Sequence, residues 1–353
     1  GTLAERATSS VSMLQGPNFA PVTRLLTAVD ERVSLKHVHR RLQSIARLLI
    51  VSTFIDDALR VSCDYRGQVF TMRSVGWGAS AGAWAPQLQQ MMPISFVLTQ
   101  TAGVLLILTR LAPQTGCVTL IFWTAIHPFL YAQQRNLEFL LESVTIIGGI
   151  MILLTSERAI KTRERRSNRE GGGIGVVGDH VDAAALEKNQ LLFVGRLLLS
   201  AVFVYYSIKM SKERLIHFFG GQLIRENVFA AFAAGILGIA LIMLTSLIIV
   251  GMKSRWCALL LAVIMGISAL YKHPWFITMW SSRTFKLDFV VGYEDISVDA
   301  WLYSDHQRYF FFQQFSTAGA LLQLVAHGPG QFSVDESEET AQPLIAVTSK
   351  GID

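Results

Sequence analysis

The sequence predicts an all-α integral membrane protein with about eight transmembrane helices, arranged as two parallel four-helix repeats. An apolar composition, a series of long hydrophobic stretches and an internal repeat lead to this prediction. Apolar residues make up 51% of the 353 residues and charged residues only 16%, whereas an average soluble chain is about 25% charged. The low charged fraction excludes an ordinary soluble domain. The three scattered cysteines exclude a disulfide scaffold.

The hydrophobic stretches are long enough to cross a bilayer, which takes about 20 mostly apolar residues. Strong stretches lie at 92–110, 115–133, 137–155, 190–209, 228–251, 254–272 and 309–327. The stretch 42–63 is weaker because charged side chains interrupt it. Its close match to the strong stretch at 190–209 makes it the first of eight predicted helices.

The internal repeat relates the two halves of the chain. Residues 45–62 align without gaps on 194–211, an offset of 149, so that Arg47 matches Arg196. Fainter similarity at an offset of 173 relates the fourth stretch to the eighth and pairs Arg135 with Arg308. Because each unit has an even number of helices, the two repeats are expected to share one orientation in the membrane.

Basic residues set the predicted orientation, since Lys and Arg are enriched in cytosolic loops. The strongest basic runs, 24–41 and 158–169, fall on one side, which we assign to the cytosol. GGGIGVVG within the linker resembles a phosphate loop, but no strand precedes it and no GK[ST] follows. The predicted order is a cytosolic segment 1–41, the first repeat 42–155, a flexible cytosolic linker 156–189, the second repeat 190–327 with a luminal loop 273–307, and a cytosolic tail 328–353.

Carboxylates within the predicted helices are the main functional lead, because charges in a bilayer are costly and usually functional. Two pairs should reach a similar depth near the luminal end, and the repeat places aromatic residues at the equivalent positions of the second unit. Such a cavity suits a ligand with a cationic group beside apolar bulk. The candidate binding residues are Asp56, Asp57, Glu138, Glu142, Tyr205, Tyr206, Phe311 and Phe315.

A structural interpretation of these charges stays open. The carboxylates could pair with Arg60 and Arg135 and tie helices together. Arg47 and Arg196 are expected to snorkel or cap helix ends, with a polar structural core as the alternative. The predicted structural polar set is therefore Arg47, Arg60, Arg135, Arg196 and Arg308. No haem, zinc or iron–sulfur pattern occurs, so no cofactor, metal or catalytic residue is expected.

Several segments resemble the surfeit-locus-protein-four family of polytopic endoplasmic-reticulum cargo receptors. They are ARLLIVSTFIDDALR at 46–60, LEFLLESVTIIGGIMILLTSER at 137–158, GRLLL at 195–199 and RYFFFQQFSTAGALLQLVAHGPGQFSVDE at 308–336. The resemblance covers about 42–336, and STF[IL][ED]D and GPG…S[VM]DE are its most specific parts. It implies a receptor that binds soluble secretory cargo in the lumen and loads it into COPII vesicles toward the Golgi.

The family resemblance also implies a ligand. Members recognise the N-terminal tripeptide of the cargo, with apolar residues around a proline, so its free α-ammonium would meet the carboxylates. The expected protein is non-catalytic, cycles between endoplasmic-reticulum membrane and Golgi, and has both termini in the cytosol. Its expected partners are luminal cargo, the COPII coat and the lipid bilayer, with a homo-oligomer as a further candidate and no nucleic acid. The alternative is a proton-coupled small-solute transporter that uses the same carboxylates. The dilysine retrieval signal of many relatives is not matched in the C-terminal VTSKGID.

Overall fold

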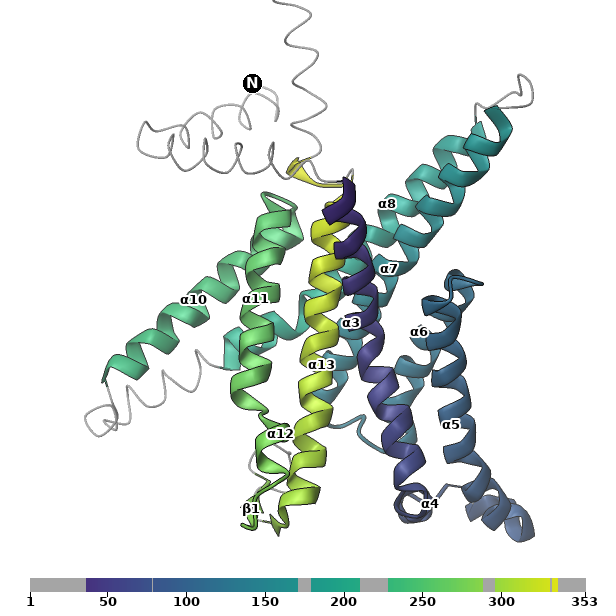
Figure 1. Ribbon diagram of the computed structural model, residues 1–353, viewed down its shortest axis with the longest axis vertical. Coiled ribbons are helices and arrows are strands. Elements are labelled where there is room, and N and C mark those ends of the chain that lie inside the picture. Colours follow the sequence, from purple (N-terminus) through teal and green to yellow (C-terminus); the bar gives the residue numbers. More distant parts are fainter. Residues whose placement is uncertain are drawn as a thin grey trace, which may run out of the picture. The chain divides into compact units, whose positions relative to one another are not determined.

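The computed structural model describes residues 36–77, 79–170, 179–209, 228–287, 296–330 and 332–335, and these are mostly helical (Figure 1). The chain divides into two compact units, Gly1–Gln43 and Ser44–Asp353. In the first unit, the described residues are the beginning of one helix. Everything that follows concerns the second unit. The glycine-rich GGGIGVVG, most of the basic run 24–41 and the C-terminal VTSKGID lie outside the described residues.

All eight apolar stretches predicted from the sequence are helical. The helices are α3 (Lys36–Cys63), α4 (Tyr65–Ser74), the 3-10 helix η1 (Ala79–Trp84), α5 (Ala85–Leu108), α6 (Pro113–Leu130), α7 (Leu137–Glu170), α8 (Asp179–Leu199), α10 (Val228–Val250), α11 (Ser254–Lys272), α12 (Trp275–Thr278) and α13 (Ala300–His327). Helical geometry resumes after Ser200 and reaches Lys209. The strands β1 (Phe285–Lys286) and β2 (Ser297–Val298) form one short antiparallel pair.

Four helical stretches in the described part of the chain are long and apolar enough to cross a bilayer. They are Gly82–Leu108, Leu137–Thr162, Asn189–Lys209 and Ser254–Thr278, and a shorter apolar helix covers Gly235–Val250. Helix α3 is not among them, and charged side chains interrupt its sequence. The protein is thus a mostly helical membrane protein, and eight crossings remain a prediction.

Two helices extend beyond their predicted ends. Helix α7 continues from the apolar stretch to Glu170, because the residues that follow are rich in Arg, Lys and Glu, which favour helix as well as apolar residues do. Helix α13 begins at Ala300, within the predicted luminal loop. Its start is fixed by Asp299, whose carboxylate accepts a hydrogen bond from the Leu302 amide at 3.4 Å.

Glycines allow pairs of helices to approach closely. A Cβ atom added to Gly148 on α7 would lie 2.5 Å from the Leu199 amide nitrogen and 2.7 Å from the Gly195 carbonyl oxygen of α8. Between α5 and α6, a Cβ on Gly116 would lie 2.7 Å from the carbonyl oxygen of Gly103. Small residues at helix crossings are typical of membrane proteins, where close backbone packing replaces a hydrophobic driving force.

A similar crossing joins α13 to α3. A Cβ atom on Gly319 would lie 2.8 Å from the Ile50 amide nitrogen and 2.9 Å from the Ala46 carbonyl oxygen. Ala46 and Ile50 precede Gly195 and Leu199 by 149 positions, which is the offset of the sequence repeat. The positions of α3 that α13 contacts are therefore equivalent, in the repeat, to the positions of α8 that α7 contacts.

Candidate functional site

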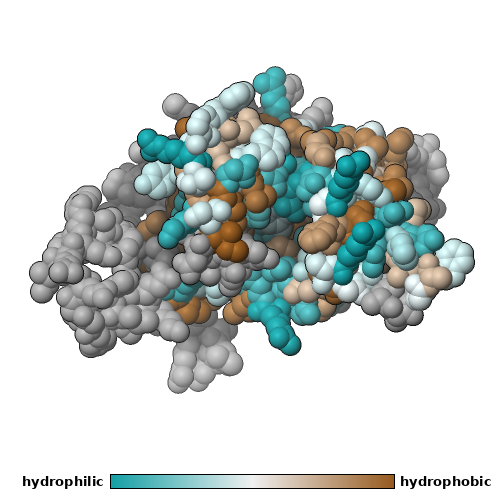
Figure 2. Space-filling view, turned by 90° about the horizontal axis from the view of Figure 1, so that it is seen from below, coloured by the Kyte–Doolittle hydropathy of each residue, from teal (hydrophilic) through white to brown (hydrophobic). Residues whose placement is uncertain are grey.

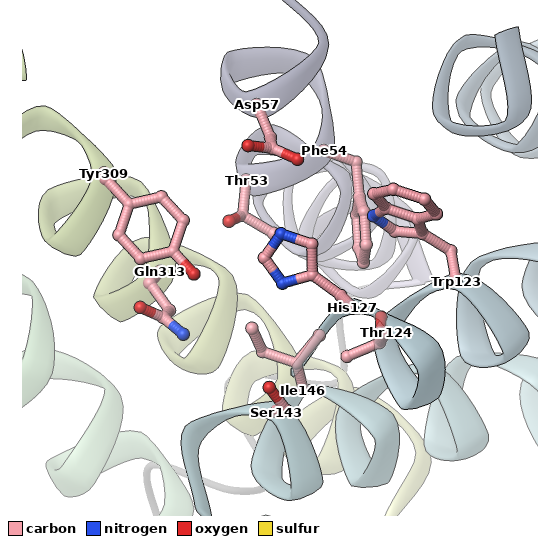
Figure 3. A pocket seen from close by; sticks show the side chains of 10 residues that line it. All are labelled: Thr53, Phe54, Asp57, Trp123, Thr124, His127, Ser143, Ile146, Tyr309 and Gln313. Carbon is pink, nitrogen blue, oxygen red and sulfur yellow. The ribbon is translucent and has the colours of Figure 1, made fainter. Parts of the chain in front are cut away.

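A cavity of about 30 Å³ lies between α3, α6, α7 and α13. In Figure 3 the His127 ring stands in the middle, between Asp57 of α3 and Ser143 of α7. A cavity of this size holds one or two water molecules. Its lining is Thr53, Phe54, Asp57, Trp123, Thr124, His127, Ser143, Ile146, Tyr309 and Gln313.

Asp57 is held by two partners. The Gln100 side-chain amide of α5 donates to Asp57 Oδ2 at 2.8 Å, and an Arg60 guanidinium nitrogen lies 3.6 Å from Oδ1. The Arg60 guanidinium also lies 5.2 Å from the centre of the Tyr309 ring, in cation–π geometry. The negative charge of Asp57 is therefore largely compensated inside the protein.

Asp56 is part of an ion network between α3 and α13. Arg308 Nε lies 2.8 Å from Asp56 Oδ1, and another nitrogen of Arg308 lies 3.0 Å from Asp305. Asp305 in turn lies 3.8 Å from Arg60. The predicted partner Arg135 is exposed in the turn before α7, and among the described residues it forms no ion pair. In the structure Asp57 lies near Arg60, one of the two predicted partners, and Asp56 pairs with Arg308 in place of Arg135.

A second cavity, of about 10 Å³, lies on the other side of Gln313. It is lined by Glu142, Val202, Tyr206, Met265, Gln313, Gln314 and Thr317. The Tyr206 hydroxyl donates to Glu142 Oε1 at 2.9 Å. Glu142 Oε2 and Gln313 Oε1 are buried and have no hydrogen-bond partner in the part of the chain that is described. Unsatisfied buried acceptors are costly, which marks this cavity as a place where a donor would be stabilised.

The remaining predicted carboxylate, Glu138, lies one turn from Glu142. It accepts a hydrogen bond from Lys209 Nζ at 3.1 Å, and the same nitrogen lies 5.9 Å from the centre of the Tyr205 ring. The side chains of Glu138 and Lys209 are 22% and 43% exposed, so their ion pair sits at the outer edge of the cavity region.

Figure 2 shows the molecule from the end that carries α4 and α12 in Figure 1. Hydrophilic residues run across the middle of this face, between hydrophobic ones. The ion network of α3 and α13 lies toward the same end, where α3 finishes and α13 begins. A polar ligand that approached from this end would therefore meet charged side chains first.

The two cavities use equivalent positions of α3 and of the helical segment 201–209 that follows α8. Thr53 and Asp57 line the first cavity, and Val202 and Tyr206 line the second. Each pair differs by the repeat offset of 149.

Positions on α7 are also equivalent to positions on α13, and the two sets are 171 residues apart in sequence. Gly148 and Gly319, which make matching close approaches, are separated by this number. It also relates Glu142 to Gln313. The remaining equivalent lining residues are Ser143 and Ile146 in the first cavity, and Gln314 and Thr317 in the second.

The offset of 171 corrects the predicted aromatic half of the site. The sequence comparison at 173 matched Glu138 and Glu142 to Phe311 and Phe315, but the structural equivalents are Tyr309 and Gln313. A shift of two residues turns a side chain by about 200° around a helix.

Phe311 and Phe315 consequently line neither cavity. Their rings stack on each other at 4.5 Å between centroids, and Phe311 also contacts the Trp275 ring of α12 at 6.3 Å. Of the predicted aromatic residues, only Tyr206 reaches a cavity wall. The aromatic side chains of the first cavity are instead Phe54, Trp123 and Tyr309.

Arg47 and Arg196 are buried rather than extended along the helix ends. Arg47 is 5% exposed and pairs with Glu157 of α7. Arg196 is fully buried, and it donates to the carbonyl oxygens of Ile248 at 3.4 Å and Phe332 at 2.5 Å. Of the two interpretations offered by the sequence, the polar structural core describes both.

The segment after α13 is tied to the beginning of α11. The Asp335 carboxylate accepts hydrogen bonds from the Lys253 amide at 2.6 Å and the Ser254 amide at 3.0 Å, as an N-terminal cap does. The Asp335 amide donates to the Gly251 carbonyl oxygen at 3.0 Å. The family-like motif GPGQFSVDE therefore has a structural role, together with Arg196.

Sequence reasoning missed Gln100, His127, Asp305, Tyr309 and Gln313 as members of this region. Gln100 and Gln313 carried a usable signal, because an amide inside a long apolar stretch must find a partner. Asp305 carried none, since it was assigned to a loop. His127 was likewise not among the candidates.

Long apolar helices around buried, charged side chains define a polytopic membrane protein with a polar interior. The chain matches the SURF4 family over residues 22–340, and it belongs to that family. No solved structure matches it.

Three curated relatives cover most of the chain. A "Surfeit locus protein 4 homolog" of Drosophila melanogaster is 25% identical over 311 residues, which is 88% of this chain and 94% of the relative. The homolog of the same name in Schizosaccharomyces pombe is 26% identical over 295 residues, covering 84% and 81%. The "ER-derived vesicles protein ERV29" of Saccharomyces cerevisiae is 21% identical over 296 residues, covering 84% and 76%.

Proposed function

We propose that this protein is an endoplasmic-reticulum cargo receptor that binds the N-termini of soluble secretory proteins in the lumen and loads them into COPII vesicles for transport to the Golgi. The observation that carries the proposal is the pair of cavities lined by unsatisfied buried acceptors, in a chain of the SURF4 family. The name of the yeast relative, which refers to vesicles derived from the endoplasmic reticulum, supports it.

A peptide N-terminus fits the chemistry of these cavities. Its ammonium group supplies three hydrogen-bond donors and a positive charge. The acceptors without a hydrogen-bond partner include Asp57 Oδ1, Glu142 Oε2 and Gln313 Oε1. The apolar first residues of a cargo would contact the aromatic lining of the first cavity, Phe54, Trp123 and Tyr309.

The described structure corresponds to a closed form of such a receptor. Cavities of about 30 and 10 Å³ hold single water-sized groups, not a tripeptide. Binding therefore requires side chains or helix ends to part. The Arg60–Asp305 contact, which joins α3 to α13, is the longest in the ion network, with 3.8 Å between its charged atoms.

The proposal includes eight membrane crossings in two parallel repeats, with both termini in the cytosol. The matching glycine crossings of α7 on α8 and of α13 on α3 support it, as do the equivalent linings of the two cavities. Two repeats related by a two-fold axis along the membrane normal would produce this exchange of neighbours, in which the first helix of each unit packs on the last helix of the other.

Deleting the gene and profiling secretion tests the proposal. A defined set of soluble proteins should accumulate in the endoplasmic reticulum, and a photo-crosslinker placed at the N-terminus of one of them should label the α3–α7–α13 region. Unchanged secretion together with a shift in luminal pH or in a small solute would contradict the receptor function.

That second outcome would favour a proton-coupled small-solute transporter. One observation supports this candidate, namely the continuation of buried polar groups along the same helices. Beyond the cavities, Gln323 of α13 donates to Ser156 of α7 at 2.8 Å, and Arg47 of α3 pairs with Glu157. Solute-dependent proton flux in vesicles that contain the purified protein would distinguish it.

A further inference from the structure

We propose that Glu142, with Tyr206 and Gln313, is the subsite that receives a primary ammonium group of the ligand. This inference rests on the proposed function and narrows it to one of four candidate carboxylates. The assignment follows from comparing the partners of these carboxylates and from the equivalence of the two cavities.

Glu142 is the candidate carboxylate that has no cation within ion-pair distance in the described structure. Asp56 pairs with Arg308, Asp57 with Arg60, and Glu138 with Lys209. Glu142 accepts a hydrogen bond from the neutral Tyr206 hydroxyl. A ligand ammonium would have to displace a protein cation at the other three positions, whereas at Glu142 it would supply the missing charge.

The atoms around this carboxylate suit an ammonium donor. Glu142 is 9% exposed and Gln313 is 4% exposed, and both line the second cavity. Glu142 Oε2 and Gln313 Oε1 have no hydrogen-bond partner among the described residues, so each can accept one N–H. The cavity of about 10 Å³ matches a group the size of one water molecule.

The repeat explains why only one cavity has a free carboxylate. Arg60 on α3 and Lys209, at the end of the helical segment that follows α8, are equivalent at the offset of 149. In the first cavity Arg60 compensates Asp57, which comes from its own helix. At the position of Asp57 the second unit has Tyr206, and Lys209 pairs with Glu138 instead. In the second cavity, Glu142 of α7 therefore has no cation within ion-pair distance among the described residues.

The Glu142→Gln substitution is a conservative test, because the chain itself has glutamine at the equivalent position, 313. Glu187→Gln is the control, because this carboxylate is exposed on α8 and lines neither cavity. The probes are a fluorescent peptide that begins with an apolar residue, proline and an apolar residue, its Nα-acetylated form, and an acetylated form with a lysine added near the start. Binding is measured on the full-length protein in nanodiscs.

The wild-type protein should bind the free peptide about 10- to 100-fold more tightly than the acetylated one, as a lost charge-assisted hydrogen bond implies. Glu142→Gln should remove most of this preference, and Glu187→Gln should keep it. Recovery of binding by the lysine peptide would identify any primary ammonium as the ligand, and no recovery would restrict it to the α-ammonium.

A second measurement does not depend on a folded variant. A carbodiimide activates a buried carboxylate, and an amine held against it displaces the activated oxygen as urea and forms an amide. With the wild-type protein, the free peptide should couple to Glu142, as mapped by mass spectrometry. Coupling to Asp56, Asp57 or Glu138, or unchanged discrimination in Glu142→Gln, would overturn the assignment while leaving the receptor function intact. Failure of the wild-type protein to bind the free peptide would instead contradict the proposed function.

Discussion

Gly148 and Gly319 occupy equivalent places at two different helix crossings. Gly148 lets α7 meet the backbone of α8 at Gly195 and Leu199, and Gly319 lets α13 meet the backbone of α3 at Ala46 and Ile50. The contacted positions on α3 and α8 are 149 residues apart, as in the sequence repeat. The two crossings set the distance between the helices that line both cavities.

Adding a methyl group at either crossing should destabilise the protein. Gly148→Ala places a Cβ atom 2.5 Å from a backbone nitrogen, and backbone cannot move aside as a flexible side chain does. We expect a loss of about 1–3 kcal/mol, as for other overpacked sites, seen as a lower melting temperature in detergent. Gly266→Ala on α11 is the control, because no atom lies within 4 Å of its added Cβ. Equal melting temperatures for the two variants would contradict the close crossing.

Removing one partner of the buried Arg47–Glu157 pair should cost about 3–5 kcal/mol, because the other charge is left uncompensated. Both side chains are about 5% exposed. Arg47→Met with Glu157→Leu should recover most of the loss. Arg158→Ala is the control, since its pair with Glu187 is exposed and should contribute less than about 1 kcal/mol. Thermal unfolding of the wild type, the two single variants and the double variant measures the coupling energy, and a coupling energy of zero would contradict the pairing.

Asp335→Ala should loosen the beginning of α11. The carboxylate accepts from the Lys253 and Ser254 amides, and loss of an N-terminal cap costs about 0.5–2 kcal/mol. Hydrogen exchange of the peptide that contains residues 253 and 254 should become faster, while exchange in α6 stays the same. Unchanged exchange at both places would show that this cap does not hold the helix.

Asp57→Asn and Glu142→Gln should affect different properties. Asp57 compensates Arg60 and accepts from Gln100, so its neutralisation should lower cellular abundance. Glu142 has no cation partner in the described structure, so its neutralisation should leave abundance unchanged and reduce capture of a cargo N-terminal peptide. Quantitative immunoblots and peptide pull-downs measure the two effects. The reverse result, with normal abundance for Asp57→Asn and loss of capture, would return Asp57 to the binding role.

Helix positions were predictable because long apolar stretches admit little else in a membrane protein. The end of α7 was not predictable in this way. Hydropathy shows where a helix leaves the membrane, but a charged helix such as 156–170 can continue in water. The start of α13 depended on Asp299, whose capping role could not be separated from a loop assignment by sequence alone.

The sequence repeat predicted which helices line the site more accurately than it predicted which residues line it. The offset of 149 between α3 and the stretch Asn189–Lys209 holds at the glycine crossings and at both cavities. The faint similarity at 173 between α7 and α13 was two residues away from the structural offset of 171. Apolar helices tolerate many alignments, and only backbone contacts such as that of Gly319 distinguish them. The ion pairs could not be predicted from the sequence either, because partners such as Asp56 and Arg308 lie far apart in the chain.

The crossing of α7 and α8 joins the last helix of the first predicted unit to the first helix of the second. The two units contact each other through the backbones of α7 and α8, so a rotation that separated them at this crossing would break the contact. A large rocking motion between halves, which many transporters use to alternate their openings, is therefore poorly suited to this protein. Access to its interior should come from local parting of helix ends.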